Sequence, residues 1–278
     1  MHLALSPPGF LGTTLLLVGR ELRAKLASPW LYAVASVVCL SAWAYGAGFA
    51  RTFETESVLV TTDPLMALNV LVVAFLGIVL GLRLSSSIAW EREHRTLEVL
   101  VVGPVSFEAI VLAKFLVELC VFAVLIAIYV LYLLMAQPLG VGVIGWVEAL
   151  SVGRMPLHAL PTLALGLLVS SLARTVRGAV VVYLVVVACL GLFEIVLGFL
   201  LAQPPEELSL AEAYFRAALQ GAAAFLHPAS AIARLADLAD ALTAQTPLLA
   251  SKSLLALALT AATLAAATIL SRLRGALG

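Results

Sequence analysis

Residues 85–115 read SSSIAWEREHRTLEVLVVGPVSFEAIVLAKF and hold the densest cluster of charge in the chain. Charged side chains and one histidine crowd into Glu91–Arg95, and Glu98 follows shortly after. Long apolar runs flank the cluster on both sides. This arrangement predicts a polar connection between two membrane-length segments.

The composition places the chain among membrane proteins. Its 278 residues are 63% hydrophobic and only 12% charged, with a mean hydropathy of +1.12, whereas a soluble domain carries about a quarter charged residues. The formal net charge is zero, so no basic field would recruit nucleic acid. Cys39, Cys120 and Cys189 all lie in apolar runs, which favours buried structural thiols over a disulfide framework or a zinc site.

Membrane spans are found by searching for about 20 apolar residues between charges, the length that crosses about 30 Å of hydrocarbon. Six segments qualify: residues 30–49, 64–82, 112–135, 155–173, 178–201 and 253–271. Each should be a helix, because an open strand in lipid leaves backbone groups unpaired, and Pro161 is expected to bend the fourth. The prediction is an all-α polytopic protein forming a single membrane domain over residues 1–278.

The N-terminal residues MHLALSPPGF have no basic residue ahead of their apolar part, so no cleavable signal peptide is expected.

The distribution of lysine and arginine predicts the orientation. With six spans both termini share one side, and that side would hold 11 of the 16 lysines and arginines. Because basic residues are enriched on the cytoplasmic side, both termini and the loop at residues 85–111 are expected in the cytoplasm.

Two amphipathic stretches lie outside the spans. In residues 11–28, leucines and a valine recur at steps of three or four while charges fill other faces, which predicts a helix in the cytoplasmic interface that ends at Ser28-Pro29. Residues 209–242 predict two short outer helices, the first with a capping box at Ser209 and Glu212, separated by His227-Pro228. A soluble helical hairpin is the alternative for this second stretch.

The opening stretch itself is expected to form a structured elbow. Read as a continuation of the second span, it places Glu91 and Arg95 at positions i and i+4, a favourable spacing for an ion pair. Gly103-Pro104 would break this helix, and Ser106 would cap the next one with Glu108 in its first turn. An ordinary solvated loop is the alternative on composition alone.

The run EREHRTLEVLVVGPVSFEAIVLAKF resembles the signature of type-2 ABC-exporter permeases. That signature joins the second and third spans by acidic-x-acidic, Thr-Leu-Glu and Pro-[Val/Ile]-Ser. The positions that match it are Glu91, Glu93, Thr96, Leu97, Glu98, Pro104, Val105 and Ser106. Arg95 stands where the family usually has glycine, and His227 stands where it usually has asparagine in a later Asn-Pro segment. The resemblance covers the whole chain, including the N-terminal helix, the six spans and the outer helices between the last two.

The resemblance implies a permease subunit of the bacterial cytoplasmic (inner) membrane that works with a separate ATPase. Two permease subunits, identical or not, would combine with two ATPase subunits, and ATP and Mg²⁺ would bind to the ATPase. The chain contains no G-x-x-x-x-G-K-[ST] loop, which agrees with a partner that supplies ATP hydrolysis. By the same resemblance, the residues that couple to the ATPase are Glu91, Arg92, Glu93, His94, Arg95, Thr96 and Glu98.

Glu194 is the one acidic residue deep within a predicted span. A carboxylate at mid-bilayer costs roughly 2.5–3.5 kcal/mol on insertion scales, so it should face protein or water. Gly191, Glu194 and Gly198 share one helical face, and the glycines would let another helix approach closely. Glu194 is therefore a candidate for the substrate path or a subunit interface, and a protonated or snorkelling carboxyl is the alternative.

Three further patterns have mainly structural interpretations. Lys114 and Glu118 are expected to pair at i and i+4, and Gly77 and Gly81 predict a helix contact through G-x-x-x-G. Met155 and His158 are spaced like a copper ligand pair, but chance explains this spacing better, so neither a metal nor a cofactor is expected in the chain.

Three classes of function remain open. Transport is favoured: an ATP-driven export of a lipid, glycan, peptide, cofactor or drug. The alternative is a platform on which ATP hydrolysis remodels or matures a periplasmic partner without bulk transport. An intramembrane enzyme is a distant third, because H-E-x-x-H, G-x-S-x-G and Asp-rich diphosphate motifs are all absent from the sequence.

Overall fold

The computed structural model describes residues 10–56, 64–94, 106–136, 152, 155–202, 209–226, 230 and 249–275. Within these ranges the chain is helical and contains no strand. The helices are α1 (Phe10–Leu26), α2 (Pro29–Glu56), α3 (Pro64–Glu93), α5 (Phe107–Ala136), α7 (Pro156–Leu172), α8 (Val176–Ala202), α9 (Leu210–Leu226) and α11 (Leu249–Gly275). The predicted all-α class is confirmed.

Five of these helices are long and apolar enough to cross a membrane. The qualifying segments are Pro29–Gly48, Leu68–Glu93, Phe107–Met135, Val176–Phe199 and Lys252–Leu273, and each overlaps a predicted span. The fourth predicted span corresponds to α7, which has 17 residues and is therefore only about 25 Å long at 1.5 Å per residue. This is shorter than the hydrocarbon layer of about 30 Å, so the described residues support five full spans and one shorter apolar helix.

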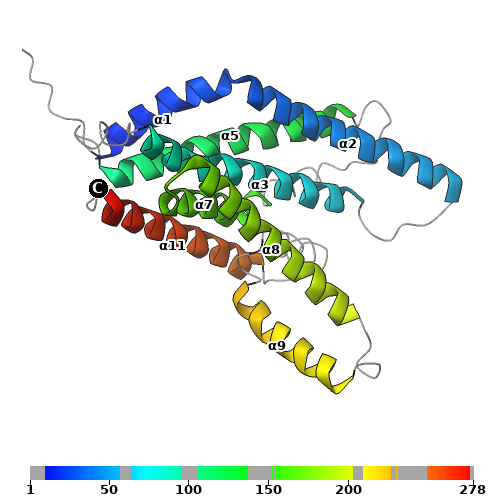
Figure 1. Ribbon diagram of the computed structural model, residues 1–278. Coiled ribbons are helices and arrows are strands. Elements are labelled where there is room, and N and C mark those ends of the chain that lie inside the picture. Colours follow the sequence, from blue (N-terminus) through cyan, green and yellow to red (C-terminus); the bar gives the residue numbers. More distant parts are fainter. Residues whose placement is uncertain are drawn as a thin grey trace, which may run out of the picture.

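The shorter helix α7 lies at the centre of the fold, between α3 and α11 (Figure 1). Most of its side chains are buried, and Pro161 lies inside the helix without ending it. α3 and α7 approach so closely that a Cβ added at Gly166 would lie 2.1 Å from the Gly81 carbonyl oxygen, and one added at Gly77 would lie 3.2 Å from Ala159 Cβ. The helix contact predicted from Gly77 and Gly81 is confirmed.

The helices α1, α2 and α5 pack together on the other side of α3 (Figure 1). Buried Tyr129 of α5 donates a 2.7 Å hydrogen bond to Asn69 Oδ1 of α3, and this bond ties the two groups of helices together inside the apolar core. α1 runs along the first half of α5 and ends at Leu26, just before Pro29 opens α2. The predicted end of this helix at Ser28-Pro29 is confirmed.

The beginning of α5 agrees with the expected cap. The Ala109 amide donates to Ser106 Oγ at 3.3 Å, and Glu108 lies in the first turn. In Figure 1 the end of α11 lies beside the beginnings of α1 and α5. Chain segments from both termini and the middle of the sequence therefore meet at one end of the bundle.

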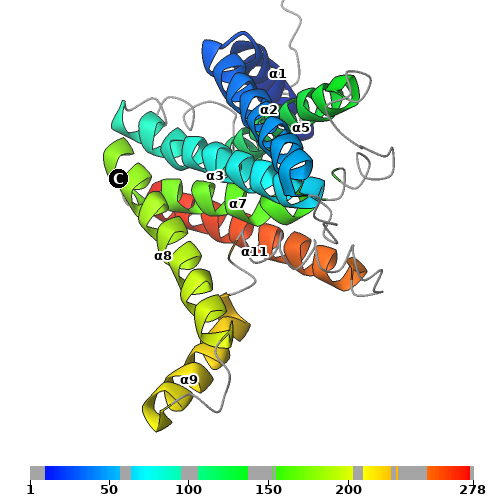
Figure 2. The same cartoon turned by 90° about the vertical axis from the view of Figure 1, so that its right-hand side faces the viewer.

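The outer helix α9 begins with the predicted capping box. Glu212 Oε2 accepts hydrogen bonds from the Ser209 hydroxyl at 2.6 Å and the Ser209 amide at 2.8 Å. α8 begins against α3 and α7, and its later part and α9 extend away from the other helices in both views (Figures 1 and 2). The second outer helix, expected after His227-Pro228, lies outside the described residues.

The expectation of buried thiols holds only in part. Cys39 and Cys120 are half-buried, whereas Cys189 is exposed on α8. The apolar run that contains Cys189 belongs to a helix whose side chains mostly face away from the rest of the chain, so an apolar neighbourhood in sequence does not imply burial here.

Candidate functional site

The candidate site is the base of the elbow between α3 and α5. Of the seven residues with an expected coupling role, Glu91, Arg92 and Glu93 end α3, and His94 lies in the turn that follows it. The other three, Arg95, Thr96 and Glu98, lie outside the described residues, as does the expected break at Gly103-Pro104. The expected pair between Glu91 and Arg95 therefore stays a prediction, and within the described residues Glu91 forms an ion pair with Lys114 of α5.

Lys114 of α5 links α3 to α1 by two ion pairs. Its Nζ lies 2.7 Å from Glu91 Oε1 of α3 and 3.6 Å from Glu21 Oε1 of α1. The Lys114 side chain is 8% exposed, so these carboxylates are needed to offset the loss of its hydration. We call Glu21, Lys114 and Glu91 the Lys114 layer.

A second set of ion pairs lies one helical turn further along α5. Glu118, whose side chain is 1% exposed, pairs with Lys25 of α1, and Arg83 Nε of α3 lies 3.6 Å from the same carboxylate oxygen. The Arg83 guanidinium also stacks 4.3 Å from the centre of the Trp30 ring, a favourable cation–π geometry. We call Lys25, Glu118 and Arg83 the Glu118 layer.

Two opposed effects act on the pKa of Lys25. Burial lowers the pKa of its ammonium below the ordinary value, and the adjacent Glu118 carboxylate acts against this shift by favouring the charged form. The ion pair is therefore what allows a lysine to be placed here in its charged state.

The two layers carry opposite net charge. The Lys114 layer has one cation and two carboxylates, the Glu118 layer has two cations and one carboxylate, and each takes one residue from α1, α3 and α5. A slide of α1 by one turn along α5 would bring Glu21 opposite Glu118, a repulsive contact between like charges. The alternation of charge therefore holds α1, α3 and α5 in one register.

The expected pair between Lys114 and Glu118 is wrong. Each residue pairs with other helices instead of with its i+4 neighbour, because a second and third helix pack against α5 here and bring opposite charges closer than the neighbour along the same helix. Spacing within α5 alone contains no information about these partners. The roles of Glu21, Lys25 and Arg83 were missed for the same reason, although their charge and their position at predicted helix ends were a signal.

The last turn of α3 also holds the turn between α7 and α8. Arg92 Nη1 donates to the Ala173 carbonyl at 2.6 Å, where α7 ends, and Glu93 Oε2 accepts from the Val176 amide at 2.9 Å, where α8 begins. A cation at the end of one helix and an anion at the start of the next both complement the helix dipoles. The last turn of α3 is thus bonded to the α7–α8 turn as well as to α5 and, through Lys114, to α1.

Exposed polar side chains surround these bonded residues. His94 is exposed and stacks on Trp90, with ring centres 4.3 Å apart. Arg174, Thr175 and Arg177 are exposed in and after the α7–α8 turn. The Glu93 bond to Val176 places this basic turn next to the end of α3, so the α7–α8 turn and the last turn of α3 form one surface.

The helix α3 is locally modified just before the elbow. The backbone amides of Ile88 and Ala89 donate to Ser170 Oγ of α7, at 2.9 and 3.1 Å. A side chain that enters the hydrogen-bond ladder of a helix is a recognised cause of bending. Tyr183 of α8 donates to the Ile78 carbonyl at 3.1 Å, so α3 is attached to α7 and α8 at two further levels.

Glu194 lies on α8 away from these layers and is half-buried. Nothing in the described part of the chain lies within 4 Å of a Cβ placed at Gly198, so the close helix approach expected there is absent among these residues. The role of Glu194 in a substrate path or subunit interface stays a prediction.

The spacing of Met155 and His158 has a structural explanation. Both residues are buried where α7 begins, and His158 Nε2 lies 3.4 Å from Ser253 Oγ of α11. Across the described ranges, no three histidine, cysteine or acidic side chains gather in a way that would hold a metal ion.

The comparison with known families agrees with this architecture. The family model of the ABC-2 family transporter protein matches residues 16–274, which include most of α1, both charge layers and the elbow. The chain belongs to the ABC-2 transporter family. No curated protein matches it. As an ABC-2 transporter permease, it is an integral membrane protein of a family whose members are transmembrane subunits that typically pair with an ATPase subunit.

Proposed function

We propose that this ABC-2 permease couples ATP hydrolysis by a separate ATPase on its cytoplasmic face to export of a substrate. The observation that carries the proposal is the bonding of the elbow. Its α3 end is joined to α1 and α5 through Glu91 and Lys114, and to the α7–α8 turn through Arg92 and Glu93. A force on the elbow would therefore reach both groups of helices.

An external partner is required on energetic grounds. A protein changes conformation in response to ATP only if some group binds the nucleotide differently in two states. The chain has no phosphate-binding loop of the G-x-x-x-x-G-K-[ST] type, so ATP and Mg²⁺ would bind to the ATPase, whose closure would move the elbow.

The seven residues assigned to coupling divide into two roles under this proposal. Glu91, Arg92 and Glu93 transmit the motion, because their side chains bond to neighbouring helices. Exposed His94 belongs to the docking surface, together with Arg95, Thr96 and Glu98 further along the elbow. Arg174 and Arg177, exposed beside the elbow, extend that surface.

The remaining parts of the proposal concern the assembly. A second permease subunit, identical or different, would pair with this chain, as is usual for the family. The complex would lie in the bacterial inner membrane with both termini in the cytoplasm, in agreement with the distribution of lysine and arginine.

Docking of the ATPase and transmission of its motion to the helices can be tested by separate experiments. The chain would be co-purified with its ATPase, and spin labels on the outer ends of α5 and α8 would report distance changes when ATP is added with vanadate. We expect Arg174→Glu/Arg177→Glu to release the ATPase. Arg92→Ala/Glu93→Ala should keep the ATPase bound but lose most of the ATP-driven change in distance.

Arg216→Glu on the outer helix α9 is the matched charge-reversal control for Arg174 and Arg177, and should change neither result. Retention of the ATPase by the Arg174→Glu/Arg177→Glu variant would show that the docking surface is assigned to the wrong residues. An unchanged ATP response in Arg92→Ala/Glu93→Ala would remove these two residues from the transmission path.

A platform that remodels a periplasmic partner is the second candidate. It is supported by α9, which extends from the body of the protein (Figure 2) and exposes Tyr214 and Phe215. In this case ATP would still change the spin-label distances, but vesicles containing the complex would show no ATP-dependent movement of any candidate cargo across the bilayer.

A further inference from the structure

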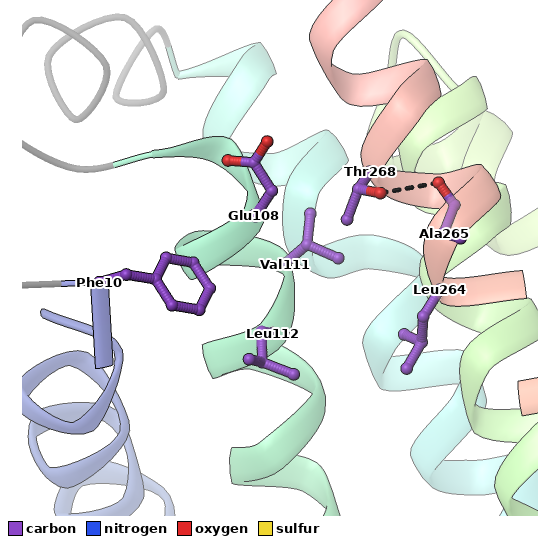
Figure 3. A pocket seen from close by; sticks show the side chains of 7 residues that line it. All are labelled: Phe10, Glu108, Val111, Leu112, Leu264, Ala265 and Thr268. Carbon is purple, nitrogen blue, oxygen red and sulfur yellow. Dashed lines mark hydrogen bonds between the residues drawn. The ribbon is translucent and has the colours of Figure 1, made fainter. Parts of the chain in front are cut away.

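A small cavity lies where α1 begins, α5 begins and α11 approaches its end (Figure 3). Its volume is about 180 Å³. Figure 3 shows the Phe10 ring directed from α1 toward α5, with Leu264 of α11 on the other side of Val111 and Leu112. The walls are therefore mainly hydrocarbon, and apart from Phe10 of α1 they belong to α5 and α11, which are long and apolar enough to cross a membrane.

The polarity of the cavity changes in one direction along two helices. On α11, Leu264 and Thr268 line the cavity, and Arg272 follows one turn beyond them on the same face, so the side chains pass from apolar to hydroxyl to guanidinium. On α5, Leu112 lies one turn from Glu108, and both line the cavity. Apolar walls thus give way to charged groups at the same end.

One positively and one negatively charged side chain lie at the charged end of the cavity. Arg272 forms an ion pair with Glu108, and the Arg272 side chain is 66% exposed while that of Glu108 is 29% exposed. An ion pair with this much exposure contributes little to stability by itself, and both partners remain accessible to a ligand that offers the opposite charges.

We propose that the cavity binds one resident phospholipid with a zwitterionic, amine-bearing headgroup. One acyl chain lies against Phe10, Leu112 and Leu264, the phosphate binds Arg272, and the ammonium binds Glu108. An anionic lipid without an amine satisfies Arg272 but places negative charge beside Glu108, so the pair of opposite charges selects the zwitterion. This lipid is a structural ligand and is separate from any exported substrate.

The test uses the full purified chain in nanodiscs that contain equal amounts of phosphatidylethanolamine and phosphatidylglycerol, followed by detergent extraction and native mass spectrometry. We expect one phosphatidylethanolamine to be retained, at about tenfold or more over phosphatidylglycerol. Arg272→Gln should weaken retention of both lipids. Glu108→Gln should abolish the preference by lowering retention of phosphatidylethanolamine and raising that of phosphatidylglycerol, because the partner of the ammonium and the repulsion of the anionic headgroup are lost together; a purely structural role of Glu108 would lower retention of both lipids.

A bulky substitution tests the acyl chain. Leu264→Trp should lower phosphatidylethanolamine retention by about tenfold, and Leu112→Phe serves the same purpose if the tryptophan variant does not fold. Leu273→Trp is the matched control, because Leu273 is exposed and does not line the cavity, and it should retain the lipid. Absence of a retained lipid in the wild type, equal retention of the two lipids, or equal loss in Leu264→Trp and Leu273→Trp would overturn the proposal.

Discussion

Lys25 and Glu118 are 93 positions apart in the chain and form an ion pair between α1 and α5. Glu118 also attracts Arg83 of α3, so one buried carboxylate joins three helices. One turn away, Lys114 joins the same three helices with the opposite arrangement of charge. The elbow therefore emerges from a base whose helices are held in register by charge as well as by apolar packing.

Removal of Glu118 should be strongly destabilising. Glu118→Gln leaves Lys25 and Arg83 facing each other without a carboxylate between them, and the loss of one partner of a buried ion pair typically costs about 3–5 kcal/mol. Unfolding of the purified protein by denaturant in mixed micelles measures this cost. Glu21→Gln is the matched control: the Glu21 side chain is 31% exposed, and the expected cost is about 1 kcal/mol or less. Equal costs for the two variants would contradict the role given to burial.

Charge reversal tests whether the Glu118 layer has three members. Lys25→Glu should destabilise the protein by placing a carboxylate beside Glu118. Adding Glu118→Lys restores this pair but places the new cation beside Arg83, so rescue should be partial. Further addition of Arg83→Glu should extend the rescue, short of wild-type stability because the stacking of Arg83 on Trp30 is lost, as read by unfolding midpoints. If the double reversal already restores full stability, Arg83 makes no energetic contribution to the layer.

Gly81 should not tolerate a methyl group. A Cβ at this position would lie 2.1 Å from Tyr183 Oη and 2.9 Å from the Thr162 carbonyl oxygen, so Gly81→Ala must separate α3 from α7 and α8. Overpacking of this kind typically costs about 1–3 kcal/mol, and thermal unfolding in detergent should show it. Gly198→Ala is the control, because no described atom lies within 4 Å of its Cβ. Gly81→Ala/Tyr183→Phe should recover only part of the loss, since the Thr162 contact remains.

The first turn of α9 should depend on pH through Glu212. Hydrogen bonds from the Ser209 hydroxyl and amide lower the pKa of this carboxyl below its ordinary value. A carboxyl whose pKa is lower in the folded state stabilises that state above its unfolded pKa, and the contribution disappears as the pH falls through the lowered value. Amide hydrogen exchange at the start of α9, corrected for the intrinsic effect of pH, should therefore accelerate in acid.

Ser209→Ala supplies the comparison for this titration. It removes the hydroxyl donor, so the Glu212 pKa should move back toward its ordinary value and exchange should accelerate at a higher pH than in the wild type. An identical pH profile for the two proteins would show that the capping box does not control the titration.

Local patterns in the sequence were sufficient to predict where the helices lie in the chain. Five predicted spans, the end of α1 before Pro29 and the caps at Ser106 and Ser209 agree with the structure, because hydropathy, proline and capping act on residues that are neighbours in the chain. The elbow motif was likewise sufficient to identify the family, since the residues of the motif are contiguous in the sequence.

Only the tertiary structure determined which side chains pair with one another. It replaced the expected Lys114–Glu118 pair by contacts to α1 and α3, assigned Arg92 and Glu93 to the α7–α8 turn, and placed a short α7 at the centre of the bundle. A charge in a helix pairs with whichever opposite charge the packing of other helices brings nearest, and that choice depends on segments far away in sequence. Periodicity along one helix reports which faces are apolar, but it does not report which helix will cover them.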